Sequence, residues 1–252
     1  MQKDIRIIIL AGGKGTRMKG EVPKVLVQLN AKPMIKYVLE SISKSGIDEN
    51  PVVVVGHRRE EIMQELGDKY NYAIQEEQLG TGHAIMIAES LLKNKSKNVM
   101  VLPSDHPFIT TETIQKLANK HLESGAKITM ATVKLPDFKD WRNVFYNSFS
   151  RIIRNEKNEI TKDVQFRDTN DEEKKVTEIN QIFFCFNANW LWKNLKKLQT
   201  NNDQKQYYQT DLIQIAMNQG EKIESIDIEP TEALAANSNE EFEVLKKFVP
   251  EI

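Results

Sequence analysis

The sequence is almost without cysteine, since a single one stands among its 252 residues. One cysteine excludes an internal disulfide. Cys185 lies in the apolar stretch "IFFCF", where a small buried thiol in a strand is expected rather than a reactive nucleophile. Thiol chemistry therefore has no support in this sequence.

Long hydrophobic runs are also missing. The longest, such as residues 7–11, fall far short of the roughly 20 residues that a membrane-spanning helix needs. The first residues, "MQKDIR", lack the layout of a signal peptide. Together these absences predict a cytoplasmic protein without a membrane partner.

Neither sign of charge predominates in the chain. Its 35 basic and 36 acidic residues leave a net charge of -1, which gives no global attraction to nucleic acid or an anionic membrane. The basic run "KNKSK" at 93–97 is typical of a solvated helix end. Any site for an anionic ligand must therefore be built locally, and nucleic acid is not an expected partner.

The sequence has no internal repeat, no Pro/Ser-rich linker and no low-complexity tract. Apolar runs instead alternate with helical patterns, which is typical of a mostly parallel sheet flanked by helices. The predicted strands cover 5–11, 51–56, 98–103, 127–133, 151–156 and 178–186. The predicted helices cover 33–46, 59–68, 81–94, 187–198 and 239–248.

One α/β domain over residues 1–252 is the expected organisation, because 40% apolar residues can build a core at this length. The regular pattern loosens between about residues 134 and 180, where "FRDTNDEEKKVTE" is dense in charge. Two interpretations of this insertion remain open, namely hairpins laid over a pocket and a merely solvated segment.

The stretch "LAGGKGTRMKGEVPKVL" follows the first predicted strand directly. Its first glycines, Gly12, Gly13 and Gly15, allow a sharp turn whose N–H groups can approach phosphate oxygens. Basic residues that can surround a polyphosphate are Lys14, Arg17 and Lys24. The stretch is neither a Walker A motif nor GxGxxG. It predicts a phosphate-binding loop, and the alternative is a plain strand-to-helix turn.

The string "LAGGKGTRM…PKVL" closely resembles the signature of the sugar nucleotidyltransferases, which join a nucleoside triphosphate to a sugar 1-phosphate and release pyrophosphate. The resemblance implies their Rossmann-like, mostly parallel mixed sheet with an inserted sugar-binding lid. It also implies that Arg17 meets the leaving β and γ phosphates and that Lys24 meets the α-phosphate region, both as catalytic residues. The implied nucleotide-binding loop consists of Leu10, Ala11, Gly12, Gly13, Lys14 and Gly15.

A second stretch, "IQEEQLGTGHAI" at 74–85, is similar to the base-recognition segment of the uridylyl branch, the pyrophosphorylase half of the bacterial enzyme that makes UDP-N-acetylglucosamine. This similarity implies that Gln75 reads the base and that Gly80 and Thr81 complete the pocket, with UTP as the favoured nucleotide. Independently, an amide suits this task because it both donates and accepts hydrogen bonds.

The stretch "VMVLPSDHPF" places Asp105 directly after a buried strand, where open α/β sheets hold their ligands. Mg²⁺ takes oxygen ligands, and the resemblance implies that Asp105 and Asn237 bind it. An ordinary turn or helix cap is the alternative for both residues. The four histidines, at 57, 83, 106 and 121, lack metal-ligand spacing and are expected to be structural or on the surface.

The resemblance also implies a set of sugar-binding residues: Ser150, Gln165, Asn180, Tyr208 and Thr210. Several positions depart from the uridylyl branch. Ser150 stands where the family has a glycine, and Gln165 stands where it has a glutamate that binds the sugar. Gln181 and Ile182 stand where the family has threonine and glycine. The Ser104 segment looks more like the mannose 1-phosphate guanylyltransferases. The identity of the sugar is therefore open.

The predicted function is Mg²⁺-dependent transfer of UMP from UTP to N-acetylglucosamine 1-phosphate or a related hexose 1-phosphate. The hexapeptide repeats of a left-handed β-helix are missing, so the acetyltransferase half of the bifunctional enzyme is not expected. One alternative is a guanylyl- or thymidylyltransferase for another sugar, such as mannose 1-phosphate. Another is a relative that binds nucleotide or sugar phosphate without turnover. The oligomeric state is not readable from the sequence.

Overall fold

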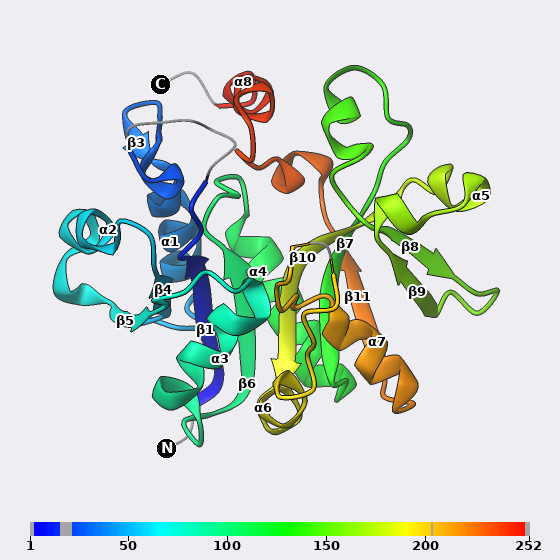
Figure 1. The fold of residues 1–252 in the computed structure, drawn as a ribbon, viewed down its shortest axis with the longest axis horizontal. Coiled ribbons are helices and arrows are strands. Elements are labelled where there is room, and N and C mark those ends of the chain that lie inside the picture. The colour runs from blue at the N-terminus through cyan, green and yellow to red at the C-terminus, as the bar shows by residue number, and fades with distance from the viewer. Residues whose placement is uncertain (1–2, 16–21, 203, 250–252) are drawn as a thin grey trace.

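The computed structural model describes residues 3–15, 22–202 and 204–249, and nine of its described strands form one sheet (Figure 1). Seven strands follow one another from edge to edge: β11 (Ile223–Asp227), β7 (Ile128–Lys134), β10 (Glu178–Asn187), β6 (Ser96–Pro103), β1 (Lys3–Ala11), β4 (Val52–Val55) and β5 (Asn71–Ile74). Only β10 runs antiparallel to its neighbours in this order. The expected mostly parallel mixed sheet is confirmed.

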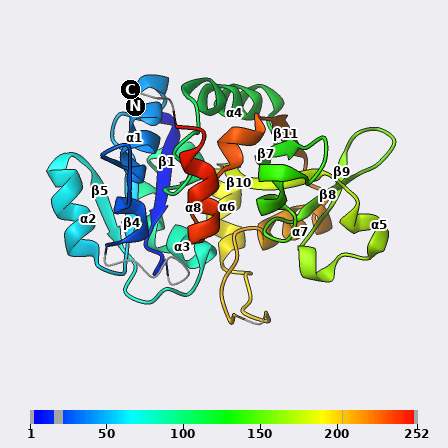
Figure 2. The same cartoon turned by 90° about the horizontal axis from the view of Figure 1, so that it is seen from above.

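Helices cover both faces of this sheet (Figure 2). One face packs on α1 (Met34–Ser45), α2 (Arg59–Leu66), α4 (Thr111–Ser124) and α8 (Asn239–Lys246), and the other on α3 (Thr81–Leu92), α6 (Ala188–Leu195) and α7 (Asp211–Asn218). Successive side chains of a strand point to opposite faces. In β1, Ile7 and Ile9 accordingly join the first core and Ile8 the second. Within the described ranges, no helix has the length and apolar character to cross a bilayer.

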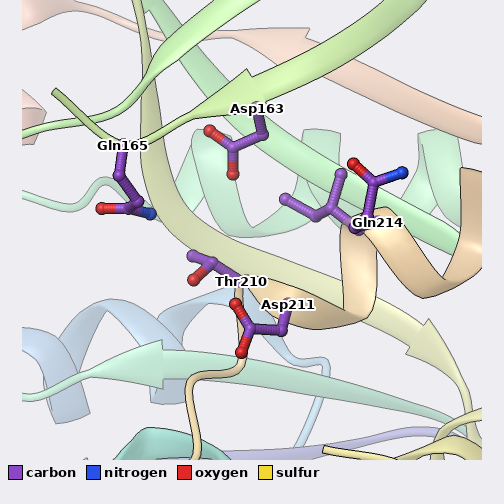
Figure 3. Close-up of a pocket in the computed structure, with 6 residues that line it drawn as sticks. Asp163, Gln165, Thr210, Asp211 and Gln214 are labelled. Atoms are coloured by element: carbon purple, nitrogen blue, oxygen red, sulfur yellow. The ribbon is translucent and has the colours of Figure 1, made fainter. Parts of the chain in front are cut away.

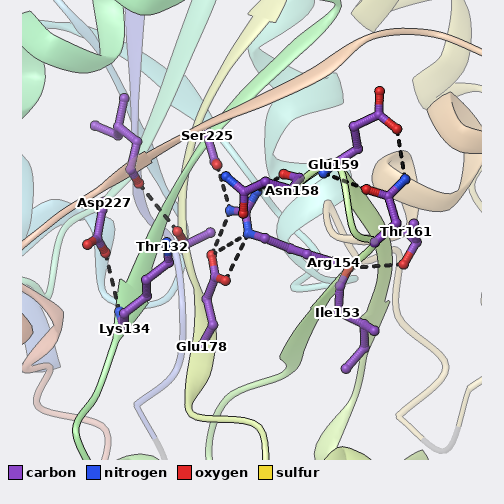
Figure 4. A network of polar contacts seen from close by, with 12 residues as sticks. Thr132, Lys134, Ile153, Arg154, Asn158, Glu159, Thr161, Glu178, Ser225 and Asp227 are labelled. Atoms are coloured by element: carbon purple, nitrogen blue, oxygen red, sulfur yellow. Dashed lines mark hydrogen bonds and ion pairs between the residues drawn. The ribbon is translucent and has the colours of Figure 1, made fainter.

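The remaining strands are short. β2 (Gln28–Leu29) pairs with β3 (Lys32–Pro33), while β8 (Arg151–Arg154) and β9 (Ile160–Val164) form a hairpin that joins β10 through the pair Ile179 and Arg151. Arg154 fixes this hairpin to the sheet, because its guanidinium grips both carboxylate oxygens of Glu178 at 2.6 to 3.1 Å and donates to Ser225 Oγ at 2.8 Å (Figure 4). Such bidentate contacts hold two segments in one orientation.

The insertion is partly packed and partly solvated. The fully buried Arg151 donates to the Phe149 carbonyl at 2.8 Å, and its guanidinium lies 4.5 Å from the Phe138 ring centre and 5.1 Å from that of Phe166. These contacts bring together an aromatic side chain that precedes β8 and one that follows β9. The charged stretch behind them forms the exposed helix α5 (Asp171–Lys174). The insertion thus contains a packed part around Arg151 and a solvated part at α5.

The sequence predicted the buried strands better than the amphipathic or short elements. The six predicted strands correspond to β1, β4, β6, β7, β8 and β10, and Cys185 is buried in β10, where burial raises the pKa of its thiol. No prediction covered α4, α7, β5, β9 or β11. Short strands of mixed polarity, such as "NYAI" in β5, lack the continuous apolar run that identified the others.

His121 on α4 gives the fold a defined pH dependence. Its ring nitrogens lie 2.8 Å from Thr129 Oγ1 and 3.1 Å from Asn98 Oδ1, and burial lowers its pKa to about 4. A base whose pKa is lower in the folded than in the unfolded state stabilises the fold above its unfolded pKa of about 6.5 and loses that contribution as the pH falls toward 4.

We therefore expect the free energy of unfolding of the wild type, relative to that of His121→Gln, to fall by about 2 kcal/mol between pH 7.5 and pH 4.5. Urea unfolding of both proteins at the two pH values measures this. Taking the difference between the proteins removes the contributions of all other titrating groups. Identical pH dependence in the two proteins would contradict the assignment.

Candidate active site

The predicted phosphate loop lies where parallel strands end together. Leu10 in β1 is in register with Val54 in β4 and with Pro103 in β6, so residues 12–15 and Ser104 both emerge at the upper edge of the sheet in Figure 1. The Leu10 carbonyl accepts hydrogen bonds from Ser104 N at 3.3 Å and Oγ at 2.7 Å. Ser104 therefore locks the loop start to the segment that carries Asp105.

Lys24 joins three segments that are far apart in the sequence. Its ammonium donates to the Asp105 carboxylate and, at 2.7 Å, to Asn237 Oδ1. A Cβ on Gly15, whose φ is +59°, would lie 2.8 Å from Lys24 Cβ. The glycine therefore lets the loop pack closely on Lys24. Arg17 lies outside the described residues.

The charge of Asp105 is stabilised by its neighbours. Burial by itself raises the pKa of Asp105, but Lys24 and His106 together outweigh it and hold that pKa well below its usual range. The buried His106 places Nδ1 3.0 Å from Asp105 Oδ1, and its ring meets Phe183 edge-on. Asp105 is thus an oriented carboxylate at neutral pH.

The donor set suits a hard cation. Asp105 and Asn237 each direct an oxygen at one positively charged group, the Lys24 ammonium. Mg²⁺ binds such oxygens and typically uses only one or two protein groups together with substrate phosphates. Within the described part of the chain, no cluster of at least three His, Cys, Asp or Glu side chains is arranged for a metal. The residues therefore fit a cation that is shared with a ligand, not an all-protein cage.

Gln75 is buried directly after β5 and faces the glycine loop. Its Nε2 lies 3.2 Å from the Gly80 carbonyl and 3.1 Å from His83 Nδ1. A Cβ on Gly12 would lie 2.7 Å from Gln75 Oε1, so only glycine fits there without displacing the amide. The structure thus brings Gln75, Gly12 and Gly80 together, whereas Gly13 and Lys14 are exposed.

Thr81 connects the nucleotide side of the site to the segment expected to bind sugar. Gly82 N donates to the Tyr207 carbonyl at 2.8 Å, Tyr207 N donates to the Leu79 carbonyl at 2.8 Å, and Gln209 N donates to Thr81 Oγ1 at 3.0 Å. These bonds fix residues 207–209 against the start of α3. The Thr81 hydroxyl oxygen consequently faces this segment.

The residues predicted to bind sugar lie in that segment or next to it. Gln165 and Thr210 line a cavity of about 70 Å³ between β9 and α7 (Figure 3). Asn180 N donates to the Ser150 carbonyl at 3.3 Å, and Asn180 Nδ2 donates at 2.8 Å to Asp163, which also lines the cavity. The Tyr208 carbonyl accepts from Asp211 N at 3.3 Å. The predicted set is thus brought together.

One departure from the resembled family lies in a bulge of β10. Register is lost between Asn180 and Phe184, and Ile182 has a φ of +56°, which suits the family glycine better than a β-branched residue. Ile182 N donates to Asn180 Oδ1 at 2.8 Å, and the buried Gln181 amide has no partner among the described residues. The strained backbone at Ile182 therefore places its N–H where it orients the Asn180 side chain.

The sequence matches the model of the MobA-like NTP transferase domain over residues 7–205. The chain belongs to this family. It is 41% identical over 224 residues to bifunctional protein GlmU of Acetivibrio thermocellus, with 88% of this chain and 46% of the relative covered. It is 37% identical over 251 residues to bifunctional protein GlmU of Caldicellulosiruptor saccharolyticus, with 98% and 52% covered. The chain spans about half the length of these curated relatives.

Solved structures confirm the fold of this NTP transferase. A Bacillus anthracis protein assigned as a glucose-1-phosphate thymidylyltransferase, in complex with sucrose, has a TM-score of 0.77 at 16% identity and covers 98% of this chain and 96% of its own. A CMP:2-keto-3-deoxy-manno-octonic acid synthetase with CTP has a TM-score of 0.69 at 15% identity and covers 97% of each chain. The nucleotide-diphospho-sugar transferase fold is thus confirmed.

The sequence analysis missed residues of this NTP transferase that touch the predicted site. His106 and His83, expected to be structural or on the surface, contact Asp105 and Gln75. Asp163 was not singled out. It stands two positions before Gln165 in an extended segment, so the period of two in a strand could have placed both on one side. The contacts of the histidines depend on the tertiary fold and have no comparable signal.

Proposed function

We propose that the protein transfers UMP from UTP to a sugar 1-phosphate, either N-acetylglucosamine 1-phosphate or a related hexose 1-phosphate, and releases pyrophosphate. The observation that carries this proposal is the Lys24 ammonium, which bonds both Asp105 and Asn237 beside the glycine loop. Membership of the NTP transferase family and the similarity to GlmU proteins support it.

The reaction needs no protein nucleophile. An ionised oxygen of the sugar phosphate attacks the α-phosphorus in line, and the electron pair of the breaking bond to the β-phosphate leaves with pyrophosphate. Lys24 offsets charge at the α-phosphate, and the backbone of Gly12 and Gly13 can approach the phosphates closely. Asp105 and Asn237 would hold Mg²⁺, which supplies further positive charge to the phosphate oxygens. Catalysis then consists of positioning and electrostatic stabilisation.

Pyrophosphate release in the presence of Mg²⁺ tests the proposal when the common nucleoside triphosphates are crossed with a panel of sugar 1-phosphates. Release with UTP and a hexose 1-phosphate is the expected result. Pyrophosphate release only with GTP or dTTP would support the proposed nucleotidyl transfer but show that the enzyme uses a base other than uracil. Nucleotide binding without release in any combination would overturn the proposed activity.

Gln75 is expected to control the affinity for the base. In Gln75→Glu the amide donors are lost while the size is kept, so a base carbonyl and the carboxylate repel each other. We expect the Kd for UTP to rise roughly 10- to 100-fold, as is typical when a partnered hydrogen bond to a buried group is lost. Titration calorimetry measures this, with the exposed Gln28→Glu as the matched control. An unchanged Kd for UTP in Gln75→Glu would show that Gln75 does not recognise the base.

A further inference from the structure

Asp163 has an unusual position for a carboxylate. Its Oδ2 accepts the 2.8 Å hydrogen bond from Asn180 Nδ2, but its Oδ1 is shielded from solvent without any hydrogen-bond partner among the described residues. Burial raises the pKa of Asp163 to about 6, although the Ser150 and Asn180 side chains favour the charged form. A buried acceptor that lacks a partner is costly to the fold, which indicates a site that a ligand completes.

The cavity beside Asp163 is rich in acidic and neutral polar groups. It is lined by Asp163, Gln165, Thr210, Asp211, Ile213 and Gln214. Asp211 raises the pKa of Asp163 further through the proximity of a second negative charge, and burial raises that of Asp211 itself. The volume of about 70 Å³ exceeds what one water molecule needs, so the cavity can admit a substituent of a ligand.

The basic side chains of the adjacent hairpin do not neutralise these acids. Arg151 donates to backbone carbonyls among aromatic rings, Arg154 is bound to Glu178, and Lys162 of β9 is bound to Glu173. No lysine or arginine is among the cavity's lining residues. Among the described residues, no basic side chain lowers the pKa of Asp163 or Asp211, and two such carboxyl groups favour a ligand that brings positive charge.

We propose that Asp163 is a specificity-determining residue and that this cavity binds the free amino group of an amino sugar 1-phosphate. The inference rests on the proposed function, because Thr210 and Gln165 are the residues expected to meet the sugar. An ammonium group in the cavity lies near the carboxylates of Asp163 and Asp211 and the hydroxyl of Thr210, which all line it (Figure 3). Charge-assisted hydrogen bonds of this kind are stronger than those of a neutral hydroxyl.

The variant Asp163→Asn separates charge from shape. Its side-chain oxygen can still accept from Asn180, so the connection between β9 and β10 is retained. The group directed into the cavity becomes a donor and repels an ammonium. Asp171→Asn, on the exposed helix α5, is the matched control for removing one carboxylate from the insertion.

The test compares glucosamine 1-phosphate, glucose 1-phosphate and N-acetylglucosamine 1-phosphate at pH 7 in two assays. Titration calorimetry, with a UTP analogue that cannot be cleaved between the α and β phosphates, reports binding, and pyrophosphate release reports turnover. In the wild type we expect glucosamine 1-phosphate to bind roughly tenfold more tightly than the other two. We expect this preference for glucosamine 1-phosphate to fall to about twofold or less in Asp163→Asn and to stay unchanged in Asp171→Asn. Both variants should keep near-native circular dichroism.

The two proposals fail in different ways. Turnover of sugar phosphates without preference for the amine would overturn this inference and leave the proposed function intact. The same holds if the preference for glucosamine 1-phosphate survives in Asp163→Asn, or if the N-acetylated sugar binds best. Preferential binding of the amine without pyrophosphate release from any nucleotide would support the cavity assignment and overturn the proposed catalysis.

Discussion

Asp105→Asn is expected to lower kcat about 10²- to 10³-fold at saturating Mg²⁺ while the protein stays folded. The asparagine oxygen can still accept from Lys24, so the contact between the segments is retained. The negative charge is lost, and with it the stronger of the two proposed oxygen ligands for the cation. Each oriented charge contact to a phosphate transition state contributes roughly 3 to 4 kcal/mol, which gives the size of this effect.

The control for Asp105→Asn is Asp4→Asn, since Asp4 is an exposed carboxylate that is paired with Lys97 at the opposite end of the sheet from the phosphate loop. Pyrophosphate release at increasing Mg²⁺ measures both variants. We expect native turnover in Asp4→Asn. Native turnover in Asp105→Asn at saturating Mg²⁺ would show that Asp105 does not hold the metal.

Gly80→Ala is expected to lower the free energy of unfolding by at least about 3 kcal/mol, which is about 6 to 12 °C in Tm for a chain of this size. Gly80 has a φ of +104°, and a Cβ on it would lie 2.5 Å from the Tyr207 carbonyl oxygen. That oxygen cannot move freely, because it accepts from Gly82 N at 2.8 Å. The free-energy cost of the strained backbone at residue 80 therefore adds to the cost of displacing residues 206–207.

Gly125→Ala isolates the effect of the backbone angle alone. Gly125 ends α4 with a φ of +63°, and a Cβ on it would have no neighbour within 4 Å. We expect a loss of about 1 to 2 kcal/mol there. Urea unfolding of both variants measures the difference. Equal losses in the free energy of unfolding would show that the close approach of residues 206–207 contributes nothing to the effect of Gly80→Ala.

The consequence for the site extends beyond stability. The Gly80 carbonyl accepts from Gln75, and Thr81 holds Gln209 N, so a displaced Gly80 moves both sides of the site. Glycine is thus required at a place where the segments proposed to bind nucleotide and sugar touch. The sequence stretch "GTG" by itself does not reveal this, because it is equally typical of a turn that begins a helix.

The sequence by itself determined the class of fold, the family and the position of the glycine-rich loop for which phosphate binding is proposed. Short, β-branched apolar runs such as "IRIIILA" and "VVVV" are typical of strands buried on both faces, and parallel strands place their following loops at one edge. Local composition is sufficient for these conclusions. The family signature around Gly12 and Lys24 likewise needs only neighbouring residues in the chain.

Only the tertiary structure decided which distant groups meet. Nothing local to Lys24, Asp105 or Asn237 specifies that one ammonium bonds the other two, because their separation depends on how β1, β6 and the chain end pack. The contact of Asn180 with Asp163 depends in the same way on the pairing of β8 with β9 and β10. Long-range contacts follow from core packing and strand register, which no short stretch of sequence contains.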